Sequence, residues 1–446
     1  MKLSLRFLYL LPVLGILLSD SAFTDFIFPG EDSESLVLYE RALLGLSCGI
    51  LLFCYPYLLP LMRRWFLILL VALGALALES YAGWSKWMVY PHVFGKYLVL
   101  IHVFAIYAFH RRFGLPPFGL LMVVILLGLT SDLVFYHPDA LSLSAFLSNE
   151  RGFDSTSAML LLLPTLYYLN QYMARGGLTR LVTFFVGAAF IIFLQHRSVW
   201  IAMSVALVIN GLLLLLGRVD GARLNSARLL PMALIPLLLL VSGGLAIVSN
   251  PQVLKRLETS IDDIQHADKQ GTGSWRFDQL NAYLPFVEEH PITGMRLEGF
   301  ELPVQFYRLS NDGGSKVPVW QARTGHHFHS FYVDRLFYFG LVGLLLTLLV
   351  PMLLLVRRVL RPVPLPPASA ACIVFSFSML VYGFSYDWPM YFYGLMGLSL
   401  AAAAVPIQLA VAVRSALAPA PHQPALPISA PYTLPHHANA VSAART

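Results

Sequence analysis

The residues with the clearest chemical potential are a histidine and a serine at the point where a hydrophilic segment gives way to an apolar run. His329 and Ser330 are followed by nine residues and then by Gly340-Leu341-Val342-Gly343, and the apolar run continues to Val356. Imidazole has the side-chain pKa nearest neutrality, so a histidine at a water–membrane boundary is well suited to accept the proton of a hydroxyl group. The pattern therefore predicts that His329 is a general base.

The neighbouring histidines leave the identity of the base open. His326 and His327 come shortly before His329, and either can act as the base if the segment folds differently. A histidine at a helix start can also have a purely structural role. The spacing of the three histidines does not fit a zinc site, and neither does the stretch from Asp262 to His266. We therefore predict no metal site and no cofactor.

Composition places these residues in a membrane protein. The chain is 57% hydrophobic and only 12% charged, which excludes a soluble globular protein of this length. Crossing the hydrocarbon core takes roughly 20 apolar residues per helix. We predict an all-α, polytopic membrane protein with about 12 transmembrane helices and one large periplasmic loop containing short helices. The apolar runs lie near Phe7–Ala22, Ala42–Met62, Phe66–Trp84, His92–Phe109, Pro117–Phe135, Thr156–Met173, Leu181–Leu194, Val199–Leu216, Leu229–Val248, Phe331–Val356, Ala370–Tyr386 and Met390–Val411.

Basic residues determine the predicted orientation. Every second loop carries lysine or arginine, for example Arg63-Arg64, Arg111-Arg112 and Arg357-Arg358, and short loops of this kind usually face the cytoplasm. Both termini are then cytoplasmic. The net charge of +6 is explained by topology and requires no nucleic-acid partner. The first run, which follows Lys2 and Arg6, can alternatively be a cleaved signal peptide.

Four regions follow from these runs. Residues 1–248 hold the first nine predicted spans, residues 249–328 form the one large hydrophilic segment, and residues 329–413 hold the last three spans. Residues 414–446 are rich in alanine and proline, which predicts a disordered cytoplasmic tail. The charge rule places the hydrophilic segment outside the cytoplasm, so catalytic elements are expected there. Within it, Ser274 can cap a helix that runs to about Glu289.

Three segments within roughly residues 195–356 resemble the O-antigen ligase and polymerase superfamily of bacterial envelope glycosyltransferases, and more closely the ligases. Gln195–Ala202 is similar to the arginine-serine stretch at the outer end of a mid-chain span. Trp275-Arg276 and the later Pro291–Gly294 are similar to the arginine, tryptophan and Pro-x-x-Gly of the large periplasmic loop, although here the tryptophan precedes the arginine. His329-Ser330 and the following glycines fit the ligase pattern.

The resemblance implies a reaction on the periplasmic side of the bacterial inner membrane. A glycan carried on undecaprenyl diphosphate is transferred, with inversion, to a hydroxyl of an acceptor such as a lipid A-core sugar, and no metal ion takes part. Arg197 and Arg276 would stabilise the leaving diphosphate, because guanidinium is always charged and grips phosphate oxygens with paired donors. His329 would deprotonate the acceptor. The candidates for substrate binding are Arg296, His326, His327, Trp275 and Ser330.

Each assignment has a structural alternative. Arg197 can extend to lipid headgroups, and Arg276 can pair with Asp278 or Glu289 on a solvated helix face. The chain also departs from the resemblance at one place. Many relatives carry an acidic residue shortly before the motif glycine, where this chain has Tyr338-Phe339.

The same features also fit other functions. A polysaccharide polymerase or a protein O-oligosaccharyltransferase would use the same motif with a different acceptor. A transporter of lipid-linked sugars would carry charges along several spans, whereas the spans here hold few, namely Glu79, Lys96, Asp132 and the neighbours Asp334 and Arg335. A direct ion pair between Asp334 and Arg335 is not expected, because the two residues are adjacent in the sequence.

Overall fold

The computed structural model describes residues 5–28, 33–142, 153–248, 252, 254–255, 258–259, 262, 271–298, 307–309, 316–318 and 328–404. Described residues up to Ala404 belong to one compact unit. The predicted tail and about half of the segment 249–328 lie outside the described residues.

The first half of the chain consists of helices joined by short loops. These elements are η1 (Leu5–Leu10), α1 (Leu11–Leu17), α2 (Ser21–Ile27), α3 (Ser33–Cys54), η2 (Tyr55–Tyr57), α4 (Pro60–Trp84), α5 (Pro91–Leu98), α6 (Leu100–Phe113), α7 (Phe118–Phe135), η3 (Pro138–Leu141), α9 (Ser155–Leu160), α10 (Leu162–Arg175) and α11 (Leu178–Phe193).

The second half adds further helices and a small antiparallel strand pair. The helices are α12 (Arg197–Leu215), α13 (Ser226–Val248), α15 (Gly271–Glu289), α16 (Phe331–Leu360), α17 (Pro367–Tyr382) and α18 (Met390–Ala403). Strand β1 (Tyr307–Leu309) pairs with β2 (Lys316–Pro318) in the register Tyr307↔Pro318.

The fold is that of a helical, multi-pass membrane protein. Among the described residues, six helices are long and apolar enough to cross a membrane, or seven if a bent pair near the N-terminus forms one span. Four shorter apolar helices, including α11, α17 and α18, also match predicted runs. The total of about 12 spans therefore stays a prediction.

The first predicted span is not one straight helix. Its residues form η1 and α1 and then enter α2, and the two halves meet at an angle of 96°. Asp20 lies at the bend, where its carboxylate accepts hydrogen bonds from the amide of Ala22 at 3.2 Å and the hydroxyl of Ser157 at 2.6 Å. A cap of this kind starts a new helix in a new direction.

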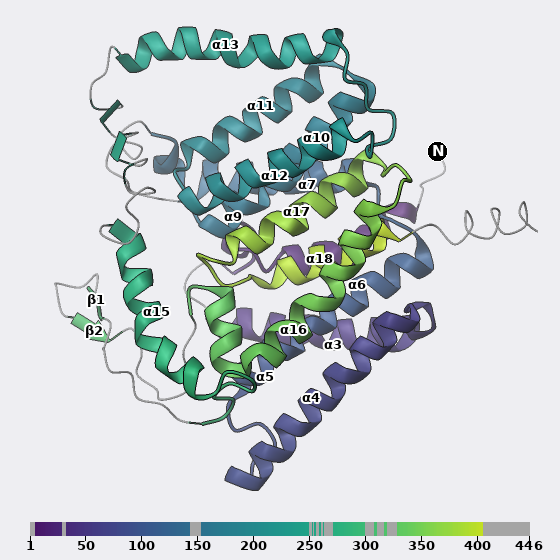
Figure 1. Cartoon of the computed structure of the whole chain (residues 1–446), viewed down its shortest axis with the longest axis vertical. Helices are drawn as coiled ribbons and strands as arrows, with labels where there is room; N and C mark the ends of the chain where they lie inside the picture. Colours follow the sequence, from purple (N-terminus) through teal and green to yellow (C-terminus); the bar gives the residue numbers. More distant parts are fainter. Residues whose placement is uncertain are drawn as a thin grey trace, which may run out of the picture. The chain divides into compact units, whose positions relative to one another are not determined.

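Helix α6 is the centre of the packing. In the most apolar 18-residue stretch of the span Pro91–Phe113, which contains α5 and α6, 72% of the residues are buried, against 22% in that of Pro60–Trp84. Helix α6 packs on α3 and α18, and α17 packs on α10, α12 and α18 (Figure 1). The close approach of α18 to α6 depends on a small residue, because a Cβ on Gly397 would lie 2.6 Å from the carbonyl oxygen of Val103.

Candidate functional site

The start of α16 is fixed to the loop between α17 and α18. Ser330 caps α16, since its hydroxyl accepts from the amide of Val333 at 3.5 Å and donates to the carbonyl of Gly383 at 3.2 Å. The ring of Phe331 stacks on Trp388 with centroids 4.1 Å apart. His329 immediately precedes this anchored cap and is exposed. The predicted base is thus exposed and lies directly before the anchored start of α16.

Aromatic packing holds α15 against the same end of α16. Tyr283 and Phe328 are buried, and their ring centroids are 4.3 Å apart. Both rings also contact Phe337, with centroids 5.7 Å and 4.8 Å from it. These aromatic residues of the segment therefore form a small core between α15 and α16.

A break in α16 is filled by the turn that follows α15. Gly340 has φ 60° and ψ −158°, so the helix is interrupted there. The amides of Leu341 and Val342 donate to the carbonyls of Pro291 and Ile292 at 2.9 and 3.1 Å. In return, the amides of Met295 and Arg296 donate to Phe337 and Tyr338, each at 2.8 Å. A break in a spanning helix is tolerated when other groups satisfy the freed backbone in this way. The Pro-x-x-Gly segment and the first motif glycine thus form one interlocked unit.

Gly294→Ala is expected to lower the free energy of unfolding by about 2 to 5 kcal/mol, from the cost of a left-handed conformation and of overpacking combined. Gly294 has φ 66°, and a Cβ there would lie 2.3 Å from the amide nitrogen of Phe339. Unfolding in mixed detergent and SDS micelles measures the effect. The matched control is Gly83→Ala on α4, where nothing lies within 4 Å of the added Cβ. Equal stability of the two variants would contradict the interlock.

Charged residues gather one turn into α16. Lys96 on α5 forms a buried ion pair with Asp334, and Arg335 forms a second ion pair with the same carboxylate. Arg335 also donates to the hydroxyl of Tyr393 on α18 at 2.6 Å. The expectation that Asp334 and Arg335 do not pair was wrong. Although neighbours on a helix project about 100° apart, the long arginine side chain reaches back to the carboxylate beside it.

Tyr338 and Phe339, which stand where many relatives carry an acidic residue, both contact α5. The ammonium of Lys96 lies 4.6 Å from the centroid of the Tyr338 ring, a cation–π contact. Phe339 stacks on Tyr97 of α5 with centroids 3.9 Å apart. Both aromatic residues therefore hold α5 against the broken part of α16, where an acidic side chain could not stack.

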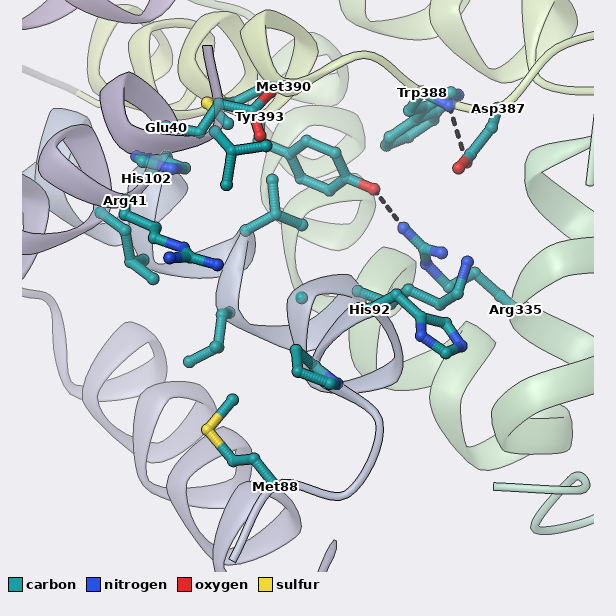
Figure 2. A pocket seen from close by; sticks show the side chains of 17 residues that line it. Glu40, Arg41, Met88, His92, His102, Arg335, Asp387, Trp388, Met390 and Tyr393 are labelled. Carbon is teal, nitrogen blue, oxygen red and sulfur yellow. Dashed lines mark hydrogen bonds between the residues drawn. The ribbon is translucent and has the colours of Figure 1, made fainter. Parts of the chain in front are cut away.

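A cavity of about 590 Å³ adjoins this charged cluster. Figure 2 shows His92, Arg335, Asp387 and Tyr393 along one wall, with the Arg335–Tyr393 hydrogen bond between two of them. The rest of the lining contains Glu40, Arg41 and His102 together with apolar side chains, namely Val37, Leu44, Met88, Leu98, Val99 and Met390. A cavity with ionic and apolar walls suits an amphiphilic ligand.

Asp387, the acidic residue of this wall, lies in the loop between α17 and α18. Burial raises its pKa from 3.8 to about 6, and Asp334 raises it further, whereas Arg335, Lys96 and the backbone amide of Trp388 lower it. That amide donates to Asp387 at 2.8 Å. Near neutral pH the carboxylate is therefore close to its titration range.

Asp387 should make stability depend on pH. Because its folded-state pKa is raised, its contribution to stability is fully present below pH 3.8 and is lost as the pH rises through about 6. The melting temperature, measured from about pH 4 to pH 8, should fall as the pH rises towards about 6. This fall should be smaller in Asp387→Asn. Asp220→Asn, at an exposed loop position, should keep the wild-type profile. An unchanged slope in Asp387→Asn would contradict this assignment.

Arg197 is brought to the same end of the bundle as His329. It opens α12 after a tight turn in which Gln195 has φ 55°. The adjacent His196 is within 2.7 Å of the carbonyl of Phe153, and Ser155, two residues later, bonds the hydroxyl of Tyr382 at 3.0 Å. Tyr382 ends α17 and directly precedes Gly383, which accepts from Ser330. Consecutive contacts thus connect the two predicted catalytic positions.

The other predicted site residues belong to α15, to the turn that follows it, or to the segment before α16. Arg276 and Trp275 lie in the first two turns of α15, whose backbone is described. Arg296 directs its guanidinium to Glu79 of α4 at 3.1 Å, so part of its charge is balanced there. His326 and His327 lie outside the described residues.

The structure is thus that of a helical membrane protein with a broken span, a segment inserted into the break and a cavity with charged residues beside it. Residues 182–348 match a family model described as O-antigen ligase, and this range contains the predicted Arg197, Arg276 and His329 together with the interlocked segments. This match supports membership of the O-antigen ligase superfamily, whose members are glycosyltransferase-like enzymes. Among curated proteins, no match was found.

Three residues of the charged site were not assigned to it from the sequence. Lys96 carried a signal, since a lone charge in an apolar span usually has a function or a partner. No sequence signal distinguished Asp387 and Tyr393, because an aspartate in a loop and a tyrosine in a helix are common. Their place beside Arg335 depends on how α18 packs against α16.

Proposed function

We propose that this protein is an O-antigen ligase-like glycosyltransferase that moves a glycan from undecaprenyl diphosphate to a hydroxyl of an acceptor, such as a lipid A-core sugar. The observation that carries the proposal is the interlock of Pro291–Gly294 with Gly340, because it ties the segment bearing Arg276 to the helix that begins beside His329. The site would face the periplasm, as the charge rule predicts.

In this mechanism the acceptor hydroxyl attacks the anomeric carbon while the bond to the lipid diphosphate breaks. His329 takes the hydroxyl proton, and one displacement gives inversion. Arg197 and Arg276 stabilise the negative charge that grows on the leaving diphosphate. The cavity beside Lys96 and Arg335 can take the polar head and first isoprene units of the donor lipid, since its walls are partly ionic and partly apolar. Arg296, Trp275, Ser330, His326 and His327 remain candidates for contacts to the two substrates.

The test uses the purified full-length protein in liposomes with a lipid-diphosphate-linked glycan and a lipid A-core acceptor. Product formation with release of undecaprenyl diphosphate supports the proposal. Transfer onto a second lipid-linked repeat instead would identify a polymerase, and transfer onto a serine- or threonine-containing peptide would identify a protein O-oligosaccharyltransferase. Movement of intact donor across the bilayer without release would identify a transporter.

Arg197→Ala and Arg276→Ala are each expected to lower turnover by about 100- to 1,000-fold, the effect of removing one well-placed donor to developing charge. Lysine at either position should restore only part of the rate, because it keeps the charge but loses the paired donors. Arg357→Ala is the control, as this arginine is exposed in the last turn of α16. Near-normal turnover in both alanine variants would exclude the proposed diphosphate contacts.

The transfer step is also expected to need no metal ion. At a temperature well below the melting temperature, chelator should leave turnover unchanged. Inhibition that added magnesium or manganese reverses would show that a cation, rather than arginine, stabilises the leaving group.

A further inference from the structure

A second group of ionisable residues lies away from the charged cavity and outside the matched range 182–348. Asp25 of α2, Asp132 of α7 and His137, which follows α7, each offer one ligand atom, and these atoms lie within 4.8 Å of one another. The Nε2 atom of His137 is 3.3 Å from Asp25 Oδ2 and 3.9 Å from Asp132 Oδ2. Ligand atoms bound to one cation at about 2.1 Å lie roughly 3 to 3.5 Å apart. The spacing is therefore close to that of a ligand set.

The state of Asp132 independently indicates a missing positive charge. Its side chain is 1% exposed, and its Oδ1 atom has no hydrogen-bond partner. Among the described residues, no lysine or arginine lies within ion-pair distance of Asp25 or Asp132. Asp154 adds a further negative charge near Asp132. The imidazole of His137 is then the one potential counter-charge near Asp132 among the described residues. A buried carboxylate with an unpartnered oxygen is costly, so a bound cation would relieve this arrangement.

The same residues join two elements that already pack closely. A Cβ on Gly128 of α7 would lie 2.0 Å from the ring of Phe23, so α2 presses directly on α7. The rings of Phe26 and Tyr136 meet edge to face with centroids 4.7 Å apart. Asp25 and His137 keep 37% and 35% of their side chains exposed, which leaves a path from water. A cation here would fasten α2, the helix after the 96° bend, to the end of α7.

We infer that Asp25, Asp132 and His137 bind one divalent first-row metal ion that clamps α2 onto α7. Two carboxylates with one imidazole suit Mn²⁺ or Zn²⁺, since imidazole favours zinc and carboxylate favours manganese. Water would complete the coordination on the open side. The ion supports the fold, and it is separate from the groups proposed for glycan transfer.

The experiment uses full-length protein purified with chelator, then dialysed and titrated with Mn²⁺ while the EPR signal of the free ion is followed. One Mn²⁺ should bind per chain and raise the melting temperature, and Zn²⁺ should compete for the same site. Asp25→Asn and His137→Gln should each weaken binding by at least about tenfold, the lower end of what even indirect changes to metal sites cause. Asp139→Asn, an exposed neighbour in η3, is the matched control and should bind like wild type.

Two results would overturn the inference. One is the lack of saturable Mn²⁺ or Zn²⁺ binding in the wild type, or binding that Asp25→Asn and His137→Gln leave unchanged. The other is a wild-type melting temperature that does not change on addition of metal but depends on pH, with this pH dependence lost in His137→Gln. That pattern would show a protonated imidazole bridging the two carboxylates in place of a metal. Both tested side chains are partly exposed, so these variants can fold even if Asp132 cannot be replaced.

Discussion

His329→Ala is expected to lower the rate of glycan transfer by about 100- to 10,000-fold, the usual contribution of a positioned general base. The loss should fall on kcat, because the base acts on the acceptor proton during the transfer step. His329 is exposed and precedes the helix cap rather than forming it, since Ser330 makes the capping contacts. The melting temperature should therefore change little. Single-turnover assays with saturating donor and acceptor measure the effect.

The control for this variant is His422→Ala, in the segment predicted to be a cytoplasmic tail, and it should retain full activity. Added imidazole should restore part of the rate to His329→Ala if the lost group is a base. Near-normal turnover in His329→Ala, together with a large loss in His326→Ala or His327→Ala, would transfer the role to that histidine. Near-normal turnover in all three would exclude a histidine base.

The positions of most helices along the chain could be predicted from the sequence more readily than the geometry of the site. Hydrophobic runs predicted where most helices lie, because about 20 apolar residues in succession have few alternatives to a membrane or a core. The break at Gly340 could not be predicted, since the run around it is uniformly apolar. The break is stable only because the turn at Pro291–Gly294 supplies the missing hydrogen bonds, and that turn comes from another part of the chain.

For charged residues inside the spans, the sequence likewise did not reveal which residues they contact. Glu79, Lys96 and Asp132 stood out because charge is costly in an apolar span. Their partners could not be identified, since Lys96 pairs with Asp334 across 238 positions and Glu79 with Arg296 across 217. Only tertiary packing brings such residues together. Lys96 and Glu79, which a transporter would have placed along a path, are instead each bound to a specific partner.

Asp334→Asn is expected to lower the free energy of unfolding by about 3 to 5 kcal/mol, the range found when one partner of a buried ion pair is removed. Asp334 is 0% exposed, and the two cations that it balances, Lys96 and Arg335, are 5% and 2% exposed. Asparagine has a similar size, so the loss would come from charge rather than volume. Unfolding in mixed detergent and SDS micelles at neutral pH gives the measurement.

A double-mutant cycle separates this charge effect from general damage to the core. In Lys96→Met/Asp334→Asn one cation is removed along with the carboxylate, and Arg335 keeps its hydrogen bond to Tyr393. The double variant should therefore lose less stability than the sum of the two single variants. Asp220→Asn, exposed in a loop, should stay within about 0.5 kcal/mol of wild type. If Asp334→Asn were as stable as that control, other groups along the cavity would have to compensate Lys96 and Arg335. The ion cluster would then belong to ligand binding rather than to the stability of the fold.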